Sequence, residues 1–351
     1  MSTLLNKPQQ QAVQTTKGRV LVLAGAGSGK TRVITYRIAH LLRTGVKPEN
    51  ILGLTFTNKA AKEMQQRIAK LINPALAKKV TLSTFHSFCV KILRKHIAKL
   101  GYTKAFSIYD EKDNLRILKQ IVEEYDDKTL PHPQDLLSLF SDFKNKGMHY
   151  NELIDDTDKK KEKNLQEIFE RYDNSLKSYN ALDFDSILSL TAKLLNTHKE
   201  VAEEYQNLYQ YIMIDEYQDT NNIQYQIAEA ISKSHNNLFV VGDDDQSIYG
   251  WRGADVKHIL EFKADSFIKL EENYRSYPTI LHAANHVISH NKTRHQKRLF
   301  SSKKEDQKIH LFNAPKDVDE AQGVIDRMIK LKEKGYKWED MAILYRSNAL
   351  S

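Results

Sequence analysis

A glycine-rich segment near the start of the chain constrains the fold most strongly. Residues 24–31 read Ala-Gly-Ala-Gly-Ser-Gly-Lys-Thr and close the apolar run 20–24. Apolar residues at Val33, Ile34, Ile38, Leu41 and Leu42 follow, and their spacing predicts an amphipathic helix. A strand, a glycine turn and a helix in this order are the context that a phosphate-binding loop requires.

The residue types of this segment suit a bound phosphate. Glycines let backbone N–H groups turn toward phosphate oxygens, and the dipole of the following helix favours negative charge at its N-terminus. Lys30 is predicted to reach the β- and γ-phosphates, and the Thr31 hydroxyl to ligate Mg²⁺. Ala24 stands where the usual pattern begins with glycine. The predicted phosphate-binding residues are Gly25, Ala26, Gly27, Ser28, Gly29, Lys30 and Thr31.

Three more apolar runs indicate the rest of a sheet. Residues 51–56, 211–215 and 238–242 are nearly continuous in apolar character and lack polar alternation. Strands of this kind are typical of a parallel sheet that helices cover on both faces. The predicted fold class is therefore α/β with a parallel sheet.

Two adjacent carboxylates end the third of these runs, at Asp215 and Glu216. Parallel sheets bind ligands beyond the carboxyl ends of their strands. Asp215 is predicted to be a Mg²⁺ partner, and Glu216 to orient and deprotonate an attacking water. Small-molecule kinases and G proteins also have a phosphate loop, so these elements predict nucleotide use without defining the work that it drives.

The middle of the chain has helical periodicity and few β-branched runs. We expect residues 109–199 to form a helical insertion into a first lobe made of residues 1–108 and 200–276. The charged stretch 155–163 is predicted to be a solvated turn or helix end, with a lysine cluster that contacts DNA as the alternative. Residues 277–351 are expected to begin a second α/β lobe, with strands at 308–312 and 341–345 and helices at 280–288 and 324–331.

Composition places limits on the class of protein. Charged residues make up 28% and apolar residues 40% of the 351 residues, which fits a globular chain and excludes a collagen-like or wholly disordered one. No apolar run is long enough to span a membrane, and a lone Cys89 excludes an intrachain disulfide, so a cytoplasmic location is expected. The formal charge of +8 is compatible with a polyanionic partner but does not require one.

Six segments in a particular order carry a family resemblance. They are Leu-Asn-Lys-Pro-Gln-Gln-Gln-Ala-Val (5–13), Leu-Thr-Phe-Thr-Asn-Lys-Ala-Ala (54–61), Thr-Phe-His-Ser-Phe (84–88), Asp-Glu-Tyr-Gln-Asp-Thr (215–220), Val-Gly-Asp-Asp-Asp-Gln-Ser-Ile-Tyr-Gly-Trp-Arg-Gly-Ala (241–254) and Glu-Asn-Tyr-Arg-Ser (272–276). In this order and spacing they resemble the UvrD/PcrA/Rep family of superfamily 1 DNA helicases, over essentially residues 5–351. The resemblance implies that both lobes are RecA-like.

The resemblance also implies roles around the nucleotide. Gln9 matches a glutamine that reads adenine, although its polar surroundings alone would leave it on a solvated helix face. Arg32 and Tyr274 match residues that pack on the base. Gln246 matches a residue that couples the γ-phosphate to DNA, and Arg275 matches an arginine that stabilises charge on the γ-phosphate.

For nucleic acid, the aromatic candidates are Phe56, Tyr249 and Trp251. Aromatic faces stack on any base, which suits a sequence-independent grip on a single strand; packing in a core is the alternative for each ring taken alone. The polar candidates are Asn58, Lys59, Thr84, His86 and Arg252, among which no chemistry is assigned to the histidine.

The implied activity is ATP-dependent 3′→5′ translocation on single-stranded DNA and unwinding at junctions with duplex. Two alternatives are a non-enzymatic module that binds ATP and DNA, and the motor half of a helicase–nuclease. Family members continue well beyond residue 351 and carry a second γ-phosphate arginine there. Residues 1–351 alone are therefore expected to bind nucleotide weakly, hydrolyse it slowly and unwind DNA poorly. Repair or replication proteins are the expected protein partners.

Overall fold

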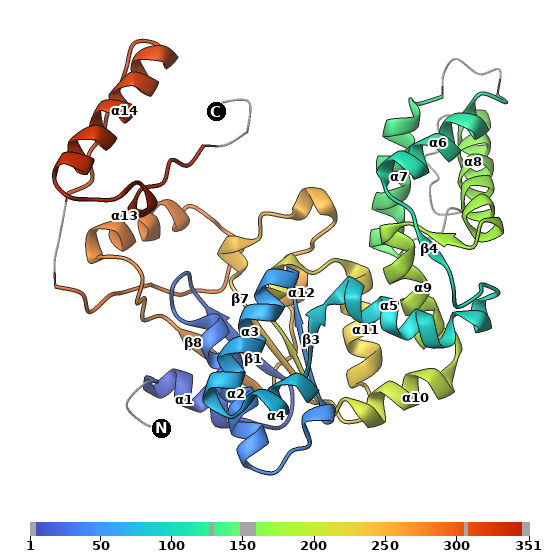
Figure 1. The fold of residues 1–351 in the computed structure, drawn as a ribbon, viewed down its shortest axis with the longest axis horizontal. Helices are drawn as coiled ribbons and strands as arrows, with labels where there is room; N and C mark the ends of the chain where they lie inside the picture. The colour runs from blue at the N-terminus through green and yellow to red at the C-terminus, as the bar shows by residue number, and fades with distance from the viewer. Residues whose placement is uncertain (1–4, 126–129, 148–158, 305–307, 346–351) are drawn as a thin grey trace. The chain divides into compact units, whose positions relative to one another are not determined.

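The computed structural model describes residues 5–125, 130–147, 159–304 and 308–345. Its contacts divide the chain into two compact units, Met1–Lys303 and Lys304–Ser351. None of the helices in the described residues is both long and apolar enough to cross a membrane. The first unit contains both sheets and most of the helices (Figure 1).

A six-stranded parallel sheet forms the centre of the first unit, which confirms the predicted fold class. Its strand order is β3-β2-β6-β7-β1-β8. The four apolar runs predicted as strands lie side by side in it, whereas β3 and β8 were not predicted. The bounds are β1 Val20–Ala24, β2 Ile51–Thr55, β3 Thr81–Thr84, β6 Tyr211–Ile214, β7 Leu238–Gly242 and β8 Ser266–Leu270.

Alternate residues of each central strand enter two different cores. In β1, Leu21 and Leu23 pack into one core, and Val20 and Val22 into the other. Because successive side chains point to opposite faces, a sheet covered on both faces needs apolar residues at every position. This requirement explains why the strands read as unbroken apolar runs.

Helices cover both faces of the sheet, as the contacts between elements and Figure 1 indicate. The helices on the face that carries Val20 and Val22 are α1 Lys7–Gln14, α2 Lys30–Arg43, α3 Asn58–Leu71 and α4 Pro74–Lys79. The helices on the face that carries Leu21 and Leu23 are α5 Phe85–His96, α9 Phe184–Thr197, α10 Lys199–Leu208, α11 Asn222–Ser232 and α12 Lys257–Leu260. Short 3₁₀ turns lie at η1 Pro48–Asn50, η2 Ile97–Leu100, η4 Tyr217–Asp219, η5 Asp244–Gln246 and η6 Gly250–Arg252.

The helical insertion has a core of its own. It is built by α6 Glu111–Val122, α7 Pro133–Lys146 and α8 Lys159–Ser178, with side chains such as Leu118, Phe140 and Tyr172 at its centre. The short strands β4 Ser107–Ile108, before α6, and β5 Ala181–Leu182, after α8, pair in parallel. Residues 155–158 of the predicted charged stretch lie outside the described residues, and Lys159 begins α8.

The boundary of the insertion differs from the prediction at its C-terminal side. Helix α9 falls within the predicted range 109–199, yet Ile187, Leu188 and Leu194 pack into a core of the sheet. An amphipathic helix joins whichever core covers its apolar stripe, and the sequence does not say which core that is. The helical core of the insertion therefore ends before α9.

Residues 277–303 also differ from the predicted domain division. They include α13 Pro278–Ile288, which contains the predicted helix 280–288. The sequence assigns them to the second lobe, but their contacts group them with the first unit. Ion pairs from Arg294 and Lys297 to residues after β7 are among the contacts that join this segment to the first unit.

The second unit contains α14 Asp317–Glu333 and η7 Trp338–Asp340. The predicted helix 324–331 lies within α14, but the strands predicted at 308–312 and 341–345 are wrong for the described residues. A strand needs a neighbour to accept and donate its backbone hydrogen bonds. Neither segment has one among the described residues, and Leu311 and Leu344 are more than nine-tenths exposed.

Candidate functional site

The phosphate loop connects the end of β1 to the first turn of α2. Gly29 precedes the helix with a φ of 92°, a left-handed conformation that glycine adopts without steric cost. Within the loop, the Ser28 hydroxyl donates to the Gly25 carbonyl at 2.7 Å. The geometry confirms the predicted strand, turn and helix, and Thr31 follows Lys30 in the first turn of α2.

The side chain of Gln9 is hydrogen-bonded to the backbone of the phosphate loop. Its side chain is fully buried, and its Nε2 donates to the Ser28 carbonyl at 2.9 Å. Its Oε1 accepts from the backbone N–H of Asn6 at 3.1 Å, as part of the capping box of α1. The alternative that places Gln9 on a solvated helix face is therefore wrong. Its role in reading adenine stays a prediction.

Lys30 and Glu216 meet across the loop. Lys30 Nζ lies 2.8 Å from Glu216 Oε2, which makes the two side chains an ion pair. The nitrogen is buried, and its angles do not allow a hydrogen bond to any described residue. Glu216 has a φ of 51°, which costs a residue with a side chain about 1–2 kcal/mol. Backbone strain of this kind occurs often at functional sites, which fits the role predicted for Glu216.

Asp215 lies deeper, at the end of β6. Burial and the neighbouring Glu216 charge raise its pKa to about 7 from an ordinary value of 3.8. The charge of Lys30 opposes this shift without overcoming it. Burial and Glu216 also raise the pKa of Asp219 to about 6. Asp215 therefore has too little neighbouring positive charge to keep its carboxylate ionised at low pH. A carboxylate in such surroundings is typical of a site that binds a cation.

The raised pKa of Asp215 predicts a pH-dependent stability. The folded chain keeps a proton that the unfolded chain releases above pH 4, so this group lowers the free energy of unfolding as pH rises from about 4 to 7. Asp215→Asn removes the charge. In buffer without Mg²⁺, we expect it to stabilise the chain by about 2–4 kcal/mol at pH 8 and by little at pH 4.5.

Thermal unfolding of both proteins across this pH range measures the effect. Asp326→Asn, at an exposed position on α14, is the matched control and should leave the pH profile unchanged. A stability difference between Asp215→Asn and wild type that is the same at pH 4.5 and pH 8 would contradict the prediction.

Gln218 connects this site to the loop after β7. Its Nε2 donates to Glu216 Oε2 and to Asp219 Oδ2, both at 3.0 Å. Its Oε1 accepts from the backbone N–H of Asp243 at 3.0 Å. Gln218 lies in the segment 215–220, but the sequence predicts no role for it, because a glutamine beside two acids has no recognisable spacing signal.

Residues 273–275 pack on the other side of the phosphate loop. Asn273 Nδ2 donates to the Ala26 carbonyl at 2.6 Å, and the Tyr274 N–H to the Gly27 carbonyl at 3.0 Å. A Cβ at Gly27 would lie 2.8 Å from Arg275 Cβ. The structure thus brings the predicted Tyr274 and Arg275 to the loop, and the Arg32 charge is close enough to affect the pKa of Tyr274.

These residues fit a nucleoside triphosphate with Mg²⁺. Gly27 and Gly29 have positive φ values that leave the loop free to turn, Lys30 Nζ is buried without a hydrogen bond, and Asp215 lacks a matching cation. Backbone N–H groups with one lysine suit phosphate oxygens. A hydroxyl with a carboxylate suits Mg²⁺.

The aromatic candidates Phe56, Tyr249 and Trp251 form a row of neighbouring rings, which we call the stack. The rings of Phe56 and Tyr249 lie 4.8 Å apart at 29°, and those of Tyr249 and Trp251 lie 6.5 Å apart at 41°. The Arg252 guanidinium covers the Trp251 ring at 4.6 Å. Trp251 is 74% exposed, so core packing is wrong as an explanation for this ring.

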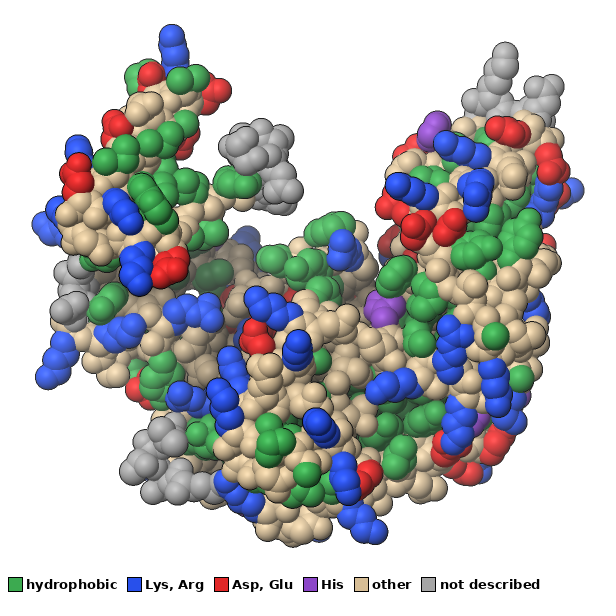
Figure 2. All heavy atoms as spheres, in the orientation of Figure 1, with side chains coloured by type: hydrophobic (Ala, Val, Ile, Leu, Met, Phe, Trp, Pro, Cys, Tyr) green, Lys and Arg blue, Asp and Glu red, His purple; other side chains and the backbone are tan. Residues whose placement is uncertain are grey.

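The stack opens into a cavity of about 640 Å³ that also reaches the helical insertion. Phe56, His86, Tyr249, Trp251 and Arg252 line it from the sheet side. Figure 2 shows a hollow there with hydrophobic side chains at its edge, and Lys and Arg side chains spread over the face shown rather than gathered in one stripe.

The other polar candidates are at helix starts near the stack. Asn58 is the first residue of α3, next to the exposed Lys59. Thr84 is nearly buried and caps α5 through the N–H of Ser87 at 3.2 Å. Burial lowers the pKa of His86, which contacts the Phe184 ring. Asn58, Lys59 and Thr84 do not line the cavity.

Comparisons with known proteins agree with this geometry. The profile of the UvrD/REP helicase N-terminal domain matches residues 5–266, and that of the UvrD-like helicase C-terminal domain matches residues 268–351. The chain is 44% identical over 360 residues to the ATP-dependent DNA helicase PcrA of Staphylococcus aureus, and 43% identical to that of Staphylococcus epidermidis. Each alignment covers 99% of this chain and 48% of the relative, so the chain spans about half the length of these curated relatives.

Proposed function

Because the chain belongs to the UvrD/REP helicase family, we propose that it is the motor portion of an ATP-dependent DNA helicase that moves 3′→5′ on single-stranded DNA. The observation that carries the ATP hydrolysis in this proposal is the pairing of Lys30 with Glu216 at 2.8 Å, next to the phosphate loop; the family carries the DNA helicase activity and its direction. A cation for the phosphates and a base for water are the two groups that hydrolysis needs.

Each group has a separate task in the proposed reaction. Loop N–H groups and Lys30 hold the β- and γ-phosphates, and Glu216 Oε2 accepts the proton of the attacking water. Bound by Thr31 and Asp215, Mg²⁺ would neutralise charge on the β- and γ-phosphate oxygens. Arg275, which lies against Gly27, is proposed to stabilise charge that develops on the γ-phosphate.

The aromatic stack is the proposed track for single-stranded DNA. Stacking accepts every base, so no base specificity is expected. The insertion contributes Glu111 and Asp142 to the lining of the cavity, and Asp185 at the start of α9 lines it as well. Carboxylates there would repel a phosphate backbone. We therefore propose that bases, rather than phosphates, enter this cavity.

Removing the exposed ring of the stack tests this role. Trp251→Ala is expected to weaken binding of a single-stranded oligonucleotide by about 5- to 150-fold, because stacking contributes about 1–3 kcal/mol per base. Fluorescence anisotropy with a labelled oligothymidine measures it.

Trp338→Ala is the matched control, since Trp338 is the other tryptophan and is also exposed. It should leave affinity unchanged. Equal affinity of wild type and Trp251→Ala at the same salt concentration would exclude the stack as a DNA contact.

Unwinding by the protein at its natural full length tests the proposed function as a whole. A duplex with a 3′ single-stranded tail should be unwound in the presence of ATP and Mg²⁺, and one with a 5′ tail should not. Binding of ATP and DNA without hydrolysis would favour the regulatory module instead. Strand cleavage by the same preparation would favour a helicase–nuclease. Single strands, junctions, and repair or replication proteins are the proposed partners.

A further inference from the structure

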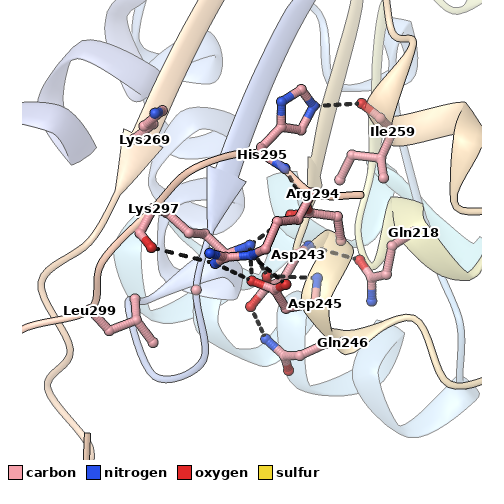
Figure 3. Close-up of polar contacts among 12 residues, drawn as sticks. Gln218, Asp243, Asp245, Gln246, Ile259, Lys269, Arg294, His295, Lys297 and Leu299 are labelled. Carbon is pink, nitrogen blue, oxygen red and sulfur yellow. Dashed lines mark hydrogen bonds and ion pairs between the residues drawn. The ribbon is translucent and has the colours of Figure 1, made fainter. Parts of the chain in front are cut away.

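A segment that follows α13 crosses the turn after β7. Residues 294–297 bring the side chains of Arg294 and Lys297 onto Asp243, Asp244 and Asp245 (Figure 3). We call residues 294–297 the strap and residues 243–245 the acidic turn. Sequence reasoning assigned no role to either of the two basic residues.

Lys297 bonds to all three members of the acidic turn. Its Nζ lies 2.7 Å from Asp243 Oδ1, 2.7 Å from Asp244 Oδ1 and 2.5 Å from Asp245 Oδ2. Its side chain is only 3% exposed. Burying three carboxylates together is very unfavourable unless a cation accompanies them, and the Lys297 ammonium provides it.

The rest of the strap completes the pairing. Arg294 makes two bonds to Asp245, at 2.8 Å and 2.7 Å, and the backbone N–H of His295 donates to Asp244 Oδ2 at 2.7 Å. Although three neighbouring acids resemble a cation site, their oxygens already bind these protein donors. The acidic turn is therefore a docking point for the strap rather than a metal site.

The acidic turn leads directly to the hydrolytic residues. Asp243 Oδ2 accepts a hydrogen bond from Gln246 Nε2, while the other oxygen of Asp243 is the one that binds Lys297. The backbone of Asp243 donates to Gln218, which in turn donates to Glu216. A continuous polar chain thus runs from Lys297 to the proposed γ-phosphate glutamine and to the proposed base.

The same region of the chain also touches the phosphate loop. A Cβ at Gly25 would lie 2.2 Å from Leu299 Cδ2, so the Leu299 side chain packs closely on that glycine. Asn285 of α13 donates to the Leu299 carbonyl at 2.8 Å. The stretch from Arg294 to Leu299 therefore contacts both the acidic turn and the loop.

We propose that Lys297 is a positioning residue for ATP hydrolysis: through Asp243, it holds Gln246 in the orientation that the γ-phosphate requires. Lys297 makes no contact with the reacting atoms in this role. The inference rests on the proposed ATPase function. It adds that the strap after α13 controls turnover.

Lys297→Met tests the proposal in the protein at its natural full length. Methionine keeps the length of the side chain but cannot hold the carboxylates. We expect kcat for DNA-stimulated ATP hydrolysis to fall by about 10- to 100-fold, because small misplacements of catalytic groups have effects of this size. KM for ATP should change little, since the phosphate loop and Lys30 are unaltered.

Combination with Gln246→Ala separates positioning from a general structural effect. If Lys297 acts through Gln246, the double variant should be as active as Gln246→Ala alone, to within about twofold. Effects that multiply instead would overturn the proposal. Lys193→Met is the matched control, because Lys193 is an exposed lysine on α9, away from the strap in the sequence; it should keep wild-type kcat.

Three further cases are distinguishable. If Lys297→Met does not fold, Lys297→Met with Asp244→Asn takes its place, because that pair removes one positive and one negative charge; wild-type kcat in it would overturn the proposal. If the wild-type protein hydrolyses no ATP, the proposed function is overturned, and this inference with it. If wild type hydrolyses ATP and Lys297→Met matches it, only the inference is overturned.

Discussion

Lys30→Ala is expected to abolish DNA unwinding and to lower the kcat of ATP hydrolysis by at least about 10²- to 10³-fold. The Lys30 side chain is 11% exposed, and its Nζ lies 2.8 Å from Glu216 Oε2. A preorganised cation in a buried site stabilises transition-state charge far more than an exposed one does. Alanine removes that cation from the phosphates and also leaves Glu216 without its charged partner.

Nucleotide affinity should fall together with turnover in this variant, because Lys30 contacts the phosphates in the ground state as well. Steady-state hydrolysis with saturating single-stranded DNA, together with equilibrium binding of a fluorescent ATP analogue, measures both. Lys17→Ala is the matched control, since Lys17 is an exposed lysine before β1. Unwinding that survives in Lys30→Ala would refute the assignment of the nucleotide site.

Glu216→Gln is expected to lower kcat by about 10²- to 10⁴-fold, the range that a positioned general base supplies. Glutamine has nearly the same shape but cannot accept the proton of the attacking water. Gln218 Nε2 now donates to Glu216 Oε2 at 3.0 Å, and the amide oxygen of glutamine can accept the same bond. The fold and the phosphate loop should therefore persist.

Nucleotide binding distinguishes this variant from the first one. Glu216→Gln should bind ATP at least as tightly as wild type, because a negative charge near the phosphates is lost, whereas Lys30→Ala should bind it weakly. Glu203→Gln, on the exposed side of α10, controls for the loss of one carboxylate. Hydrolysis by Glu216→Gln within a few-fold of wild type would assign the base to another residue.

Local patterns predicted the parts of the molecule that depend on neighbouring residues. The glycine turn after β1, the four apolar strands and α2 are confirmed, because a run of consecutive side chains determines each of them. Residues 308–312 and 341–345 also carry several apolar side chains, yet they are not strands among the described residues. A strand also needs a partner, and apolar character alone does not provide one.

The sequence by itself determined that this chain has a parallel sheet with a phosphate loop, and which residues follow each central strand. Only the tertiary structure decided that Lys297 reaches Asp243, and that Gln218 joins Asp243 to Glu216. Residues this far apart in the chain meet only where the order of strands and the path after α13 bring them together. Ion pairs and hydrogen bonds depend on that position in space, and no residue spacing along the chain records it.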